Sequence, residues 1–546
     1  MTRRCAIVAS LLAGALLVSP RAAARAQGAA YQPGIDVLDY DVRLELPDTG
    51  AFLRGDVTVT ARRDPGVREL RLDLVRTLAV RAVRVNGVAV AVRHVGDAVL
   101  VALPDGGSDT VRARVRYDGV VADGLIAQHD AAGRWTWFGD NWPDRARQWL
   151  PTVDHPSDKA TVSFTVRAPT GRTVVSNGTL LGVTAPGGST TGISETRWRE
   201  AHPIPTYLMV IGVGALARTG LDDGGCLATT LHRCPPQAVY TLPSGSRWMP
   251  GPFAAAPAIV AYFESLVGPF PYEKLAHLQS ATRFGGMENA SAIFYADQLF
   301  ARHTLGEGII AHETAHQWFG DAVTEREWGH LWLSEGFATY FAALWTRHAH
   351  GEEAFDREMA RIRTEILADS VVASRPVLDT AQRDYLRLLN ANSYQKGGYI
   401  LYLLNEQLGD SVFHTGLRAY YAAHRDGNAL SLDLQRAMET ASGRPLGEFF
   451  DQWLTRPGVP ELTVGWAYDA SAGTVSVAVS QLGASSPYAI RLPVSVVSTD
   501  GEVSTYTATV SAHVRDIIQL PHQFTARPMA VRIDPDDRVL GRLRRL

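Results

Sequence analysis

Cysteine is scarce in this sequence, with three residues in 546. Cys5 lies in the first 26 residues, so Cys226 and Cys234 are the pair left in the body of the chain. In an oxidising compartment such a pair favours a disulfide that closes a short loop, with two free thiols as the alternative. A zinc site on these cysteines is disfavoured, because it would need two more ligands close by and only His232 is available.

Long apolar runs are missing after the first 26 residues, which excludes a membrane span in the rest of the chain. At the start, Arg3 and Arg4 precede an apolar stretch, Ala6–Val18, that is too short to cross a bilayer, and an A-x-A cleavage pattern ends at Ala26. We interpret residues 1–26 as a secretory signal peptide, with an uncleaved membrane anchor as the alternative. The mature protein is expected to be exported, either to a periplasm or to the medium.

Runs of one charge are missing as well. The formal net charge is −3, and the arginines and lysines are dispersed along the chain. This pattern gives no basic stripe and so argues against a nucleic-acid partner. Internal repeats and low-complexity linkers are not found either. A chain of 546 residues is too long for a single hydrophobic core, so we expect two to four domains.

Alternation of apolar and polar residues dominates the chain from about Gln27 to Pro243. Tyr40, Val42 and Leu44 are separated by charged residues, which predicts a sheet with one face in water. Asn86-Gly87 lies between two valine-rich stretches, and this pair suits the positive φ angles of a tight hairpin turn. We therefore predict a large antiparallel β domain over residues 27–243.

The periodicity becomes helical over residues 244–457. Thr304 and Glu307 form a capping-box pattern before an apolar pair, and Gly320 is placed where this helix should end. A second helix is predicted from apolar residues spaced by three and four, namely Phe337, Tyr340, Phe341 and Leu344. Further helical stretches are predicted over Tyr399–Leu408 and Ser431–Leu454.

Strand-like alternation returns after Pro457-Gly458. Val475, Val477 and Val479 alternate with small residues, and Asp500-Gly501 marks another hairpin turn. Residues 458–546 are therefore expected to form a small β sandwich.

Residues 312–316 read His-Glu-Thr-Ala-His, an H-E-x-x-H pattern on the first predicted helix. Positions i and i+4 lie on one face of a helix, so the imidazoles of His312 and His316 can reach one cation together. A catalytic zinc needs three protein ligands and one open position. Glu313 is next to the first ligand, where a general base is required.

The third ligand is predicted to be Glu335, which follows His316 after 18 residues within the stretch W-L-S-E-G-F-A. Glu335 begins the second predicted helix. An acidic residue at a helix N-terminus also has a purely structural explanation, since it interacts favourably with the helix dipole. Taken alone, the position of Glu335 does not decide between these two explanations.

Two motifs together resemble one family. The H-E-x-x-H pattern with its downstream Glu, and Gly285-Gly286-Met287-Glu288-Asn289 upstream of it, are similar to the gluzincin zinc aminopeptidases, which include alanyl aminopeptidases and leukotriene-A hydrolase. The resemblance runs from Gln27 to about Pro460 and implies one Zn²⁺. It also implies a multidomain α+β fold: a saddle-like antiparallel β domain, a thermolysin-like, mainly helical catalytic domain and a C-terminal β sandwich.

The resemblance also implies roles for residues beside the metal. Glu288 would bind the α-ammonium group of the substrate, and Tyr394, in a Y-x-K-G element, would donate a hydrogen bond to the oxyanion. Gly285 and Gly286 would let the backbone come close to an extended substrate. Met287 and Asn289 complete this predicted substrate-binding set.

One position departs from the family pattern. The stretch from Ala146-Arg147 to Lys159-Ala160-Thr161 resembles an element of the family's N-terminal domain, in which many relatives have a Gln six residues before the Ala. That Gln lines the amine pocket, and the corresponding residue here is Asp140. Asp140 would either strengthen amine binding as a second acid or mark a local shift of the loop.

The sequence therefore predicts a zinc metallo-aminopeptidase whose partners are peptides with a free N-terminus, with Glu313 as general base. An epoxide hydrolase or bifunctional enzyme, as in one branch of the family, is the first alternative. A catalytically inactive scaffold on the same fold is the second. The sequence specifies neither the preferred N-terminal residue nor the oligomeric state.

Overall fold

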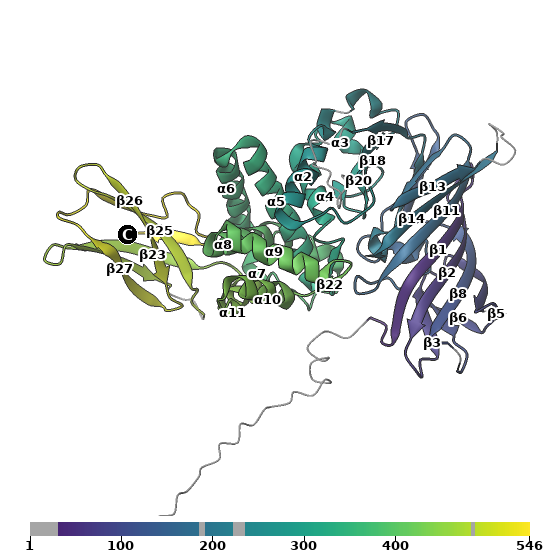
Figure 1. Cartoon of the computed structure of the whole chain (residues 1–546), viewed down its shortest axis with the longest axis horizontal. Helices are drawn as coiled ribbons and strands as arrows, with labels where there is room; N and C mark the ends of the chain where they lie inside the picture. Colours follow the sequence, from purple (N-terminus) through teal and green to yellow (C-terminus); the bar gives the residue numbers. More distant parts are fainter. Residues whose placement is uncertain (1–30, 107, 185–191, 222–234, 250, 482–485) are drawn as a thin grey trace, which may run out of the picture.

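The computed structural model describes residues 31–106, 108–184, 192–221, 235–249, 251–481 and 486–546. The chain forms an elongated molecule with a β domain at each end and a mainly helical domain between them (Figure 1). The predicted signal peptide and the pair Cys226 and Cys234 lie outside the described residues. Within the described ranges, none of the helices has both the length and the apolar character needed to cross a membrane.

The N-terminal domain is built on a large sheet, as the alternating sequence predicts. Tyr40, Val42 and Leu44 are buried, while the charged residues between them are partly or fully exposed. Among the described residues this sheet has eight strands, in the spatial order β13 (Thr179–Thr184), β14 (Ile193–Pro205), β11 (Lys159–Pro169), β1 (Ile35–Glu45), β2 (Phe52–Arg63), β8 (Thr110–Val120), β4 (Ala79–Val85) and β5 (Val88–Ala89). β1 and β11 pair in parallel, and the other neighbouring strands pair antiparallel.

The predicted hairpin at Asn86-Gly87 is confirmed. Both residues have positive φ angles, 50° and 86°, and Val85 pairs with Val88 across the turn. Two smaller sheets complete the described part of this domain, with the orders β12 (Thr173–Ser176), β15 (Ile211–Gly214), β10 (Trp135–Gly139), β9 (Leu125–His129), and β3 (Glu69–Asp73), β7 (Ala98–Ala102), β6 (Val92–Val95).

The sheet of the middle domain begins before the boundary that was expected at Pro243. β17 pairs in parallel with β18, and β18 with β20, so β16 and β17 join the sheet beside the helices. In the described part of the chain its order is β16 (Ala217–Gly220), β17 (Gln237–Thr241), β18 (Leu275–Ser280), β20 (Ala292–Ala296) and β19 (Gly286–Met287). Strand-like alternation alone does not say which sheet a strand will join.

The helices of the middle domain agree with most of the predicted stretches. They are α2 (Ala256–Val267), α3 (Asp297–Ala301), α4 (Glu307–His316), α5 (Trp332–His350), α6 (Glu352–Ala368), α7 (Ser370–Ser374), α8 (Gly397–Leu408), α9 (Asp410–His424), α10 (Ser431–Ser442) and α11 (Gly447–Thr455). The apolar stripe predicted for the second helix is buried on α5. The last predicted stretch is two helices, α10 and α11.

The predicted capping box at Thr304 and Glu307 is wrong. α4 begins at Glu307 with Gly306 as its N-cap residue. The Glu307 carboxylate accepts hydrogen bonds from Trp345 and His350 on α5 instead. A tertiary contact between α4 and α5 has replaced the local one.

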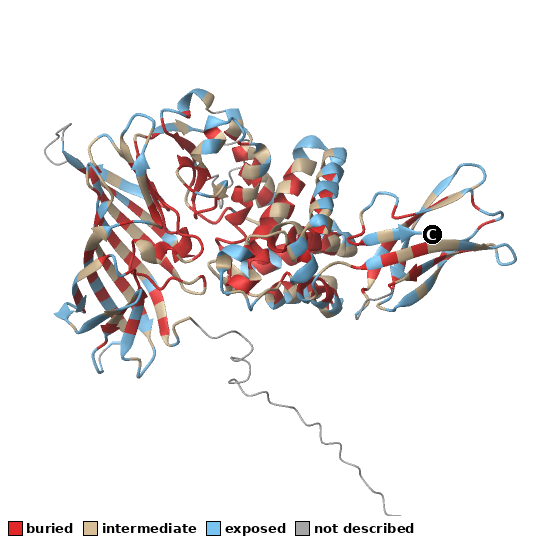
Figure 2. Ribbon diagram, turned by 180° about the vertical axis from the view of Figure 1, so that it is seen from behind, coloured by how far each residue is buried: buried red, intermediate tan, exposed pale blue. Residues whose placement is uncertain are grey.

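The C-terminal domain consists of two facing sheets, which confirms a β-rich domain after about residue 458. In the described residues their orders are β27 (Arg515–Gln523), β24 (Thr474–Ser480), β23 (Glu461–Asp469), β29 (Arg542–Arg545), and β26 (Val503–Val510), β25 (Ile490–Val497), β28 (Ala530–Ile533). Arg363 on α6 donates hydrogen bonds to the carbonyls of Val539 and Gly541, which ties this domain to the helices. Buried residues line the inner faces of the sheets and the helix packing between them (Figure 2).

Candidate active site

Three predicted metal ligands converge where α4 packs against α5. His312 and His316 lie on the last turns of α4, and Glu335 lies in the first turn of α5. The Nε2 atoms of the two histidines are 3.2 Å apart, and they lie 3.3 and 3.4 Å from Oε2 of Glu335. Two ligand atoms that are each about 2.0 to 2.1 Å from a tetrahedral zinc are about 3.3 Å apart. The three side chains therefore fit one zinc ion without rearrangement.

The charges around these ligands also favour a cation. Glu288 and Glu313 bring their carboxylates within 4.8 Å of a His316 ring nitrogen, and Glu335 adds a third. All three carboxylates are buried. Burial alone would raise the pKa of Glu335, but the imidazoles of His316 and His312 outweigh it and lower this pKa to about 2. A cation bound at this cluster would therefore have three buried carboxyl groups within reach, and it would favour their charged forms.

Contacts behind His316 fix the orientation of its ring. Nδ1 of His316 is 3.2 Å from the carbonyl oxygen of Phe319 and 3.1 Å from the hydroxyl of Ser334. With Nδ1–H donating to the carbonyl, Nε2 presents its lone pair to the ligand cluster. Ser334 directly precedes Glu335, so one short segment supplies a ligand and a support for another ligand.

Glu313, on α4, lies next to the segment that contains Gly286. A Cβ atom added at Gly286 would lie 2.0 Å from Oε1 of Glu313. Burial raises the pKa of Glu313 well above its ordinary value, although His316 acts in the opposite direction. Gly286 thus makes room for the predicted base, in addition to its expected role towards the substrate.

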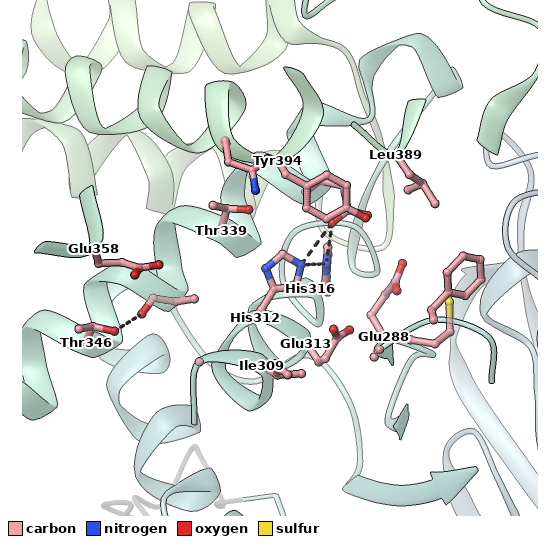
Figure 3. Close-up of a pocket in the computed structure, with 18 of the residues that line it drawn as sticks. Glu288, Ile309, His312, Glu313, His316, Thr339, Thr346, Glu358, Leu389 and Tyr394 are labelled. Carbon is pink, nitrogen blue, oxygen red and sulfur yellow. Dashed lines mark hydrogen bonds and ion pairs between the residues drawn. The ribbon is translucent and has the colours of Figure 1, made fainter. Parts of the chain in front are cut away.

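Tyr394 lies on the other side of the ligands (Figure 3). It belongs to a π-helical turn, Asn392–Lys396, and such turns are frequent at functional sites. Its ring is nearly parallel to that of His312, with 5.9 Å between the ring centroids. Burial raises the pKa of Tyr394 well above its ordinary value, so the hydroxyl remains a donor at neutral pH.

Glycines bring the Tyr394 segment close to α5. A Cβ added at Gly336, next to the ligand Glu335, would lie 2.8 Å from the carbonyl carbon of Gly397, the first residue of α8. The backbones of the two predicted motifs, W-L-S-E-G-F-A and Y-Q-K-G-G, are therefore in direct contact. This contact sets the distance between the tyrosine and the ligand cluster.

Glu288 is held relative to α4 through its backbone. The Gln317 side chain donates to the carbonyl of Glu288 at 2.7 Å and to Asp321 at 2.9 Å, and it accepts from the backbone N–H of Ser291 at 2.7 Å. Gln317 follows His316 directly. Burial raises the pKa of Glu288 to about 7, because a charge in this position lacks solvent.

A cavity of about 500 Å³ contains these groups. In Figure 3, Leu389 and Glu288 lie at one end, Thr346 and Glu358 at the other, and the histidines and Tyr394 lie between them. The wall beside Glu288 is apolar, and it is formed by Trp142, Phe284, Met287 and Leu389. A cavity of this size and lining is typical of a small-molecule or peptide site.

The other predicted substrate-binding residues are distributed as follows. Gly285, Gly286, Met287 and Glu288 line the cavity, whereas Asn289 is fully buried behind it. Asp140 is also fully buried, and its carboxylate oxygens accept from Arg145 and Arg283 and from the hydroxyl of Thr282. The structure thus gives Asp140 two guanidinium partners, which is at odds with its predicted role as a second acid for the substrate amine.

The sequence analysis assigned no role in the site to Gln317, Ser334 or Trp142. Gln317 and Ser334 adjoin predicted ligands, so inspection of ligand neighbours would have proposed them. Trp142 comes from the N-terminal domain and packs edge-on against Phe284 with 6.0 Å between ring centroids. Trp142 and Phe284 are far apart in the sequence, so no local pattern predicts that they are in contact.

Two family profiles match the chain. The profile described as "Peptidase M1 N-terminal domain" matches residues 38–208. The profile described as "Peptidase family M1 domain" matches residues 254–453, which include the whole ligand cluster.

Named relatives and solved structures agree with these matches. The chain is 29% identical over 338 residues to "Probable aminopeptidase 2" of Sulfurisphaera tokodaii, covering 58% of this chain and 41% of the relative. It is 29% identical over 336 residues to "Aminopeptidase M1" of Arabidopsis thaliana, covering 58% and 36%. The chain thus spans about two fifths of the length of these curated relatives.

The fold is similar to the crystal structure of an M1 zinc metallopeptidase from Deinococcus radiodurans, with a TM-score of 0.68 and 26% identity. That likeness covers 78% of this chain and 95% of the other. A mutant of the Deinococcus protein bound to a Tyr-Ser-Ala substrate is similar with a TM-score of 0.69.

Proposed function

Because the chain belongs to peptidase family M1, we propose that it is a zinc-dependent aminopeptidase that removes the N-terminal residue from peptides. One observation supports this most strongly. A single cavity contains three ligand atoms at tetrahedral spacing, a buried carboxylate beside them on Glu313 and a further carboxylate on Glu288. The N-terminal sequence pattern supports export as a further part of the proposal.

His312, His316 and Glu335 would hold the zinc ion. A zinc ion on these side chains supplies a Lewis acid that lowers the pKa of bound water to about 7 and polarises a carbonyl group. The donor set of two imidazoles and one carboxylate is one that catalytic zinc sites use. The Nδ1 contact of His316 with Phe319 keeps its ligand nitrogen directed at the site.

Glu313 acts as the general base. Its carboxylate accepts a proton from the attacking water and then delivers that proton to the nitrogen of the leaving amine. Burial suits this exchange, because it raises the pKa of Glu313 and makes its carboxylate a stronger base than a solvated one. Gly286 leaves the space that this carboxylate needs.

Tyr394 stabilises the oxyanion. Its hydroxyl is a neutral donor close to the ligand cluster, and a hydrogen bond to the carbonyl oxygen strengthens as negative charge develops there. The close approach of Gly336 and Gly397 holds the phenol in reach.

Glu288 determines that cleavage occurs at the N-terminus. A buried carboxylate is unfavourable unless an opposite charge joins it, and the α-ammonium group of a peptide supplies that charge. An ammonium fixed at one end of the cavity places the first peptide bond beside Glu313 and Tyr394. Peptides with a free N-terminus are therefore the proposed substrates.

A panel of amino-acid anilides tests the proposal. The purified protein should contain one zinc per chain, and it should hydrolyse at least one anilide. A chelator should abolish the hydrolysis, and added zinc should restore it. A zinc-free protein that hydrolyses none of the panel would instead support an inactive scaffold, and turnover of a lipid epoxide alone would support an epoxide hydrolase.

A further inference from the structure

Four charged residues form a cluster beside the cavity. Asp140 Oδ2 lies 2.9 Å from Arg145 and 2.8 Å from Arg283. Asp123 Oδ1 contacts the same two arginines, at 2.9 Å and 2.5 Å. Each acid therefore bridges both arginines, and the cluster is electrically balanced with two positive and two negative groups. Asp140 and Arg145 are buried within it.

The cluster joins two domains. Asp140 directly follows β10, Asp123 precedes β9, and Arg145 lies just before the 3-10 turn that begins at Ala146, all in the N-terminal domain. Arg283 belongs to the loop between β18 and β19 in the middle domain. Thr282 on the same loop donates its hydroxyl hydrogen to the other oxygen of Asp140, at 2.8 Å. Asp140 thus holds two consecutive residues of that loop.

This loop forms part of the apolar wall of the cavity. Phe284 follows Arg283 directly, and the Arg145 guanidinium lies over its ring, 5.8 Å from the centroid. Phe284 packs edge-on against Trp142, and both line the cavity with Met287. Glu288 follows Met287, so a side chain next to an ammonium bound at Glu288 would contact this wall.

We propose that Asp140 is a positioning residue that fixes the loop of Thr282–Met287 against the N-terminal domain and thereby determines how well the cavity accepts large apolar N-terminal side chains. The inference rests on the proposed aminopeptidase function. Removing the charge of Asp140 leaves Arg145 and Arg283 close together with Asp123 as their shared acid. Repulsion between the two guanidinium groups then moves the exposed member, Arg283, together with Phe284.

The test uses the zinc-loaded protein and two substrates, phenylalanine anilide and alanine anilide. The measured quantity is the ratio of their kcat/KM values. This ratio does not depend on how much of a preparation is folded, so a purely structural role would leave it unchanged. The variants are Asp140→Asn and Arg283→Gln, and the second is the safer one because the Arg283 side chain is 45% exposed.

The wild-type protein should favour the phenylalanine substrate. Either substitution should lower the ratio by about tenfold, mainly through a higher KM for that substrate, as the loss of a hydrogen bond to a charged group commonly does. The double variant should lose no more than the single ones, because both break the same contact. Asp154→Asn is the matched control. It removes an equally buried acid of the N-terminal domain, which accepts from Arg147 and Thr206 instead, and it should leave the ratio unchanged.

An unchanged ratio in both Asp140→Asn and Arg283→Gln, with an active wild type, would overturn the positioning role and leave the proposed function standing. Additive losses in the double variant would also overturn it. A zinc-loaded wild type that hydrolyses neither anilide would overturn the proposed function and this inference together.

Discussion

Among single residues, Glu313 has the most specific of the proposed chemical tasks. Its carboxylate is buried next to the ligands, where we propose that it exchanges a proton with water and with the leaving amine. Glu313 lies between His312 and His316 in the sequence of α4, but its side chain is not one of the three proposed metal ligands. Replacing Glu313 should therefore lower turnover while the protein still binds zinc.

The first prediction concerns Glu313→Gln. The amide has nearly the same shape but cannot accept the proton, so kcat should fall by at least about 100-fold while one zinc per chain remains bound. Metal analysis and anilide kinetics on one preparation check both parts. His312→Ala is the control and should lose zinc and activity together. Near-normal turnover of Glu313→Gln would exclude the assigned base.

The second prediction concerns Gly286→Ala. The added methyl group would overlap Oε1 of Glu313, so the carboxylate has to move and kcat should fall by roughly tenfold or more, with zinc still bound. Gly306→Ala, at the start of the same metal-binding helix, is the control, because its Cβ would enter open space among the described residues. Equal kcat values for the two variants would show that the close contact at Gly286 is unimportant.

At the scale of secondary-structure elements, the site depends on how closely α5 approaches the segment that begins α8. Gly336 and Gly397 let the two backbones touch. α5 provides the third ligand, and the π-helical turn before α8 provides Tyr394. The separation of these elements therefore controls the distance between the ligand cluster and Tyr394, the proposed oxyanion donor.

The third prediction concerns Gly336→Ala. Its Cβ would meet the backbone of Gly397, so the two elements must separate, which should cost about 1 to 3 kcal/mol of unfolding free energy and lower kcat. Denaturant unfolding and anilide kinetics measure these effects. Gly447→Ala on α11, where the new atom makes an ordinary 3.6 Å contact, is the matched control. A Gly336→Ala protein as stable and active as the control would contradict the account.

The sequence predicted local features well and distant contacts poorly. That His312, His316 and Glu335 lie close together on α4 and α5 agrees with the sequence, because helical spacing and short motifs depend on neighbouring residues. The partners of Asp140 were not foreseen, because Arg283 lies 143 residues away and one sequence contains no signal for such pairs. The same reason explains why Glu307 was assigned to a local cap instead of to Trp345.

At the scale of the whole molecule, stability depends on pH, in part because the folded protein keeps one buried histidine uncharged. His277 on β18 is fully buried, and its Nδ1 lies 3.0 Å from the hydroxyl of Tyr295. Burial lowers the pKa of His277 to about 3, from an ordinary value of 6.5. Between these pH values the unfolded chain binds a proton that the folded protein excludes.

The fourth prediction concerns the effect of His277 on stability as the pH changes. Because His277 binds a proton in the unfolded state but not in the folded state in this window, its contribution to the free energy of unfolding should decrease as the pH falls from 6.5 towards 3. His277 alone should lower the free energy of unfolding by about 3 kcal/mol when the pH falls from 7 to 4. Denaturant titrations of the wild type and His277→Gln at both pH values measure the difference, with the exposed His303→Asn as control. The same pH dependence in His277→Gln and the wild type would contradict it.

The most direct test of the whole account compares leucine p-nitroanilide with its N-acetylated form on the zinc-loaded protein. Acetylation removes the positive charge that Glu288 is proposed to bind and leaves the scissile bond unchanged. The free substrate should be hydrolysed at least about 100-fold faster than the acetylated one, and a chelator should stop the reaction. Equal hydrolysis of the two substrates would contradict an enzyme that recognises a free N-terminus at this site.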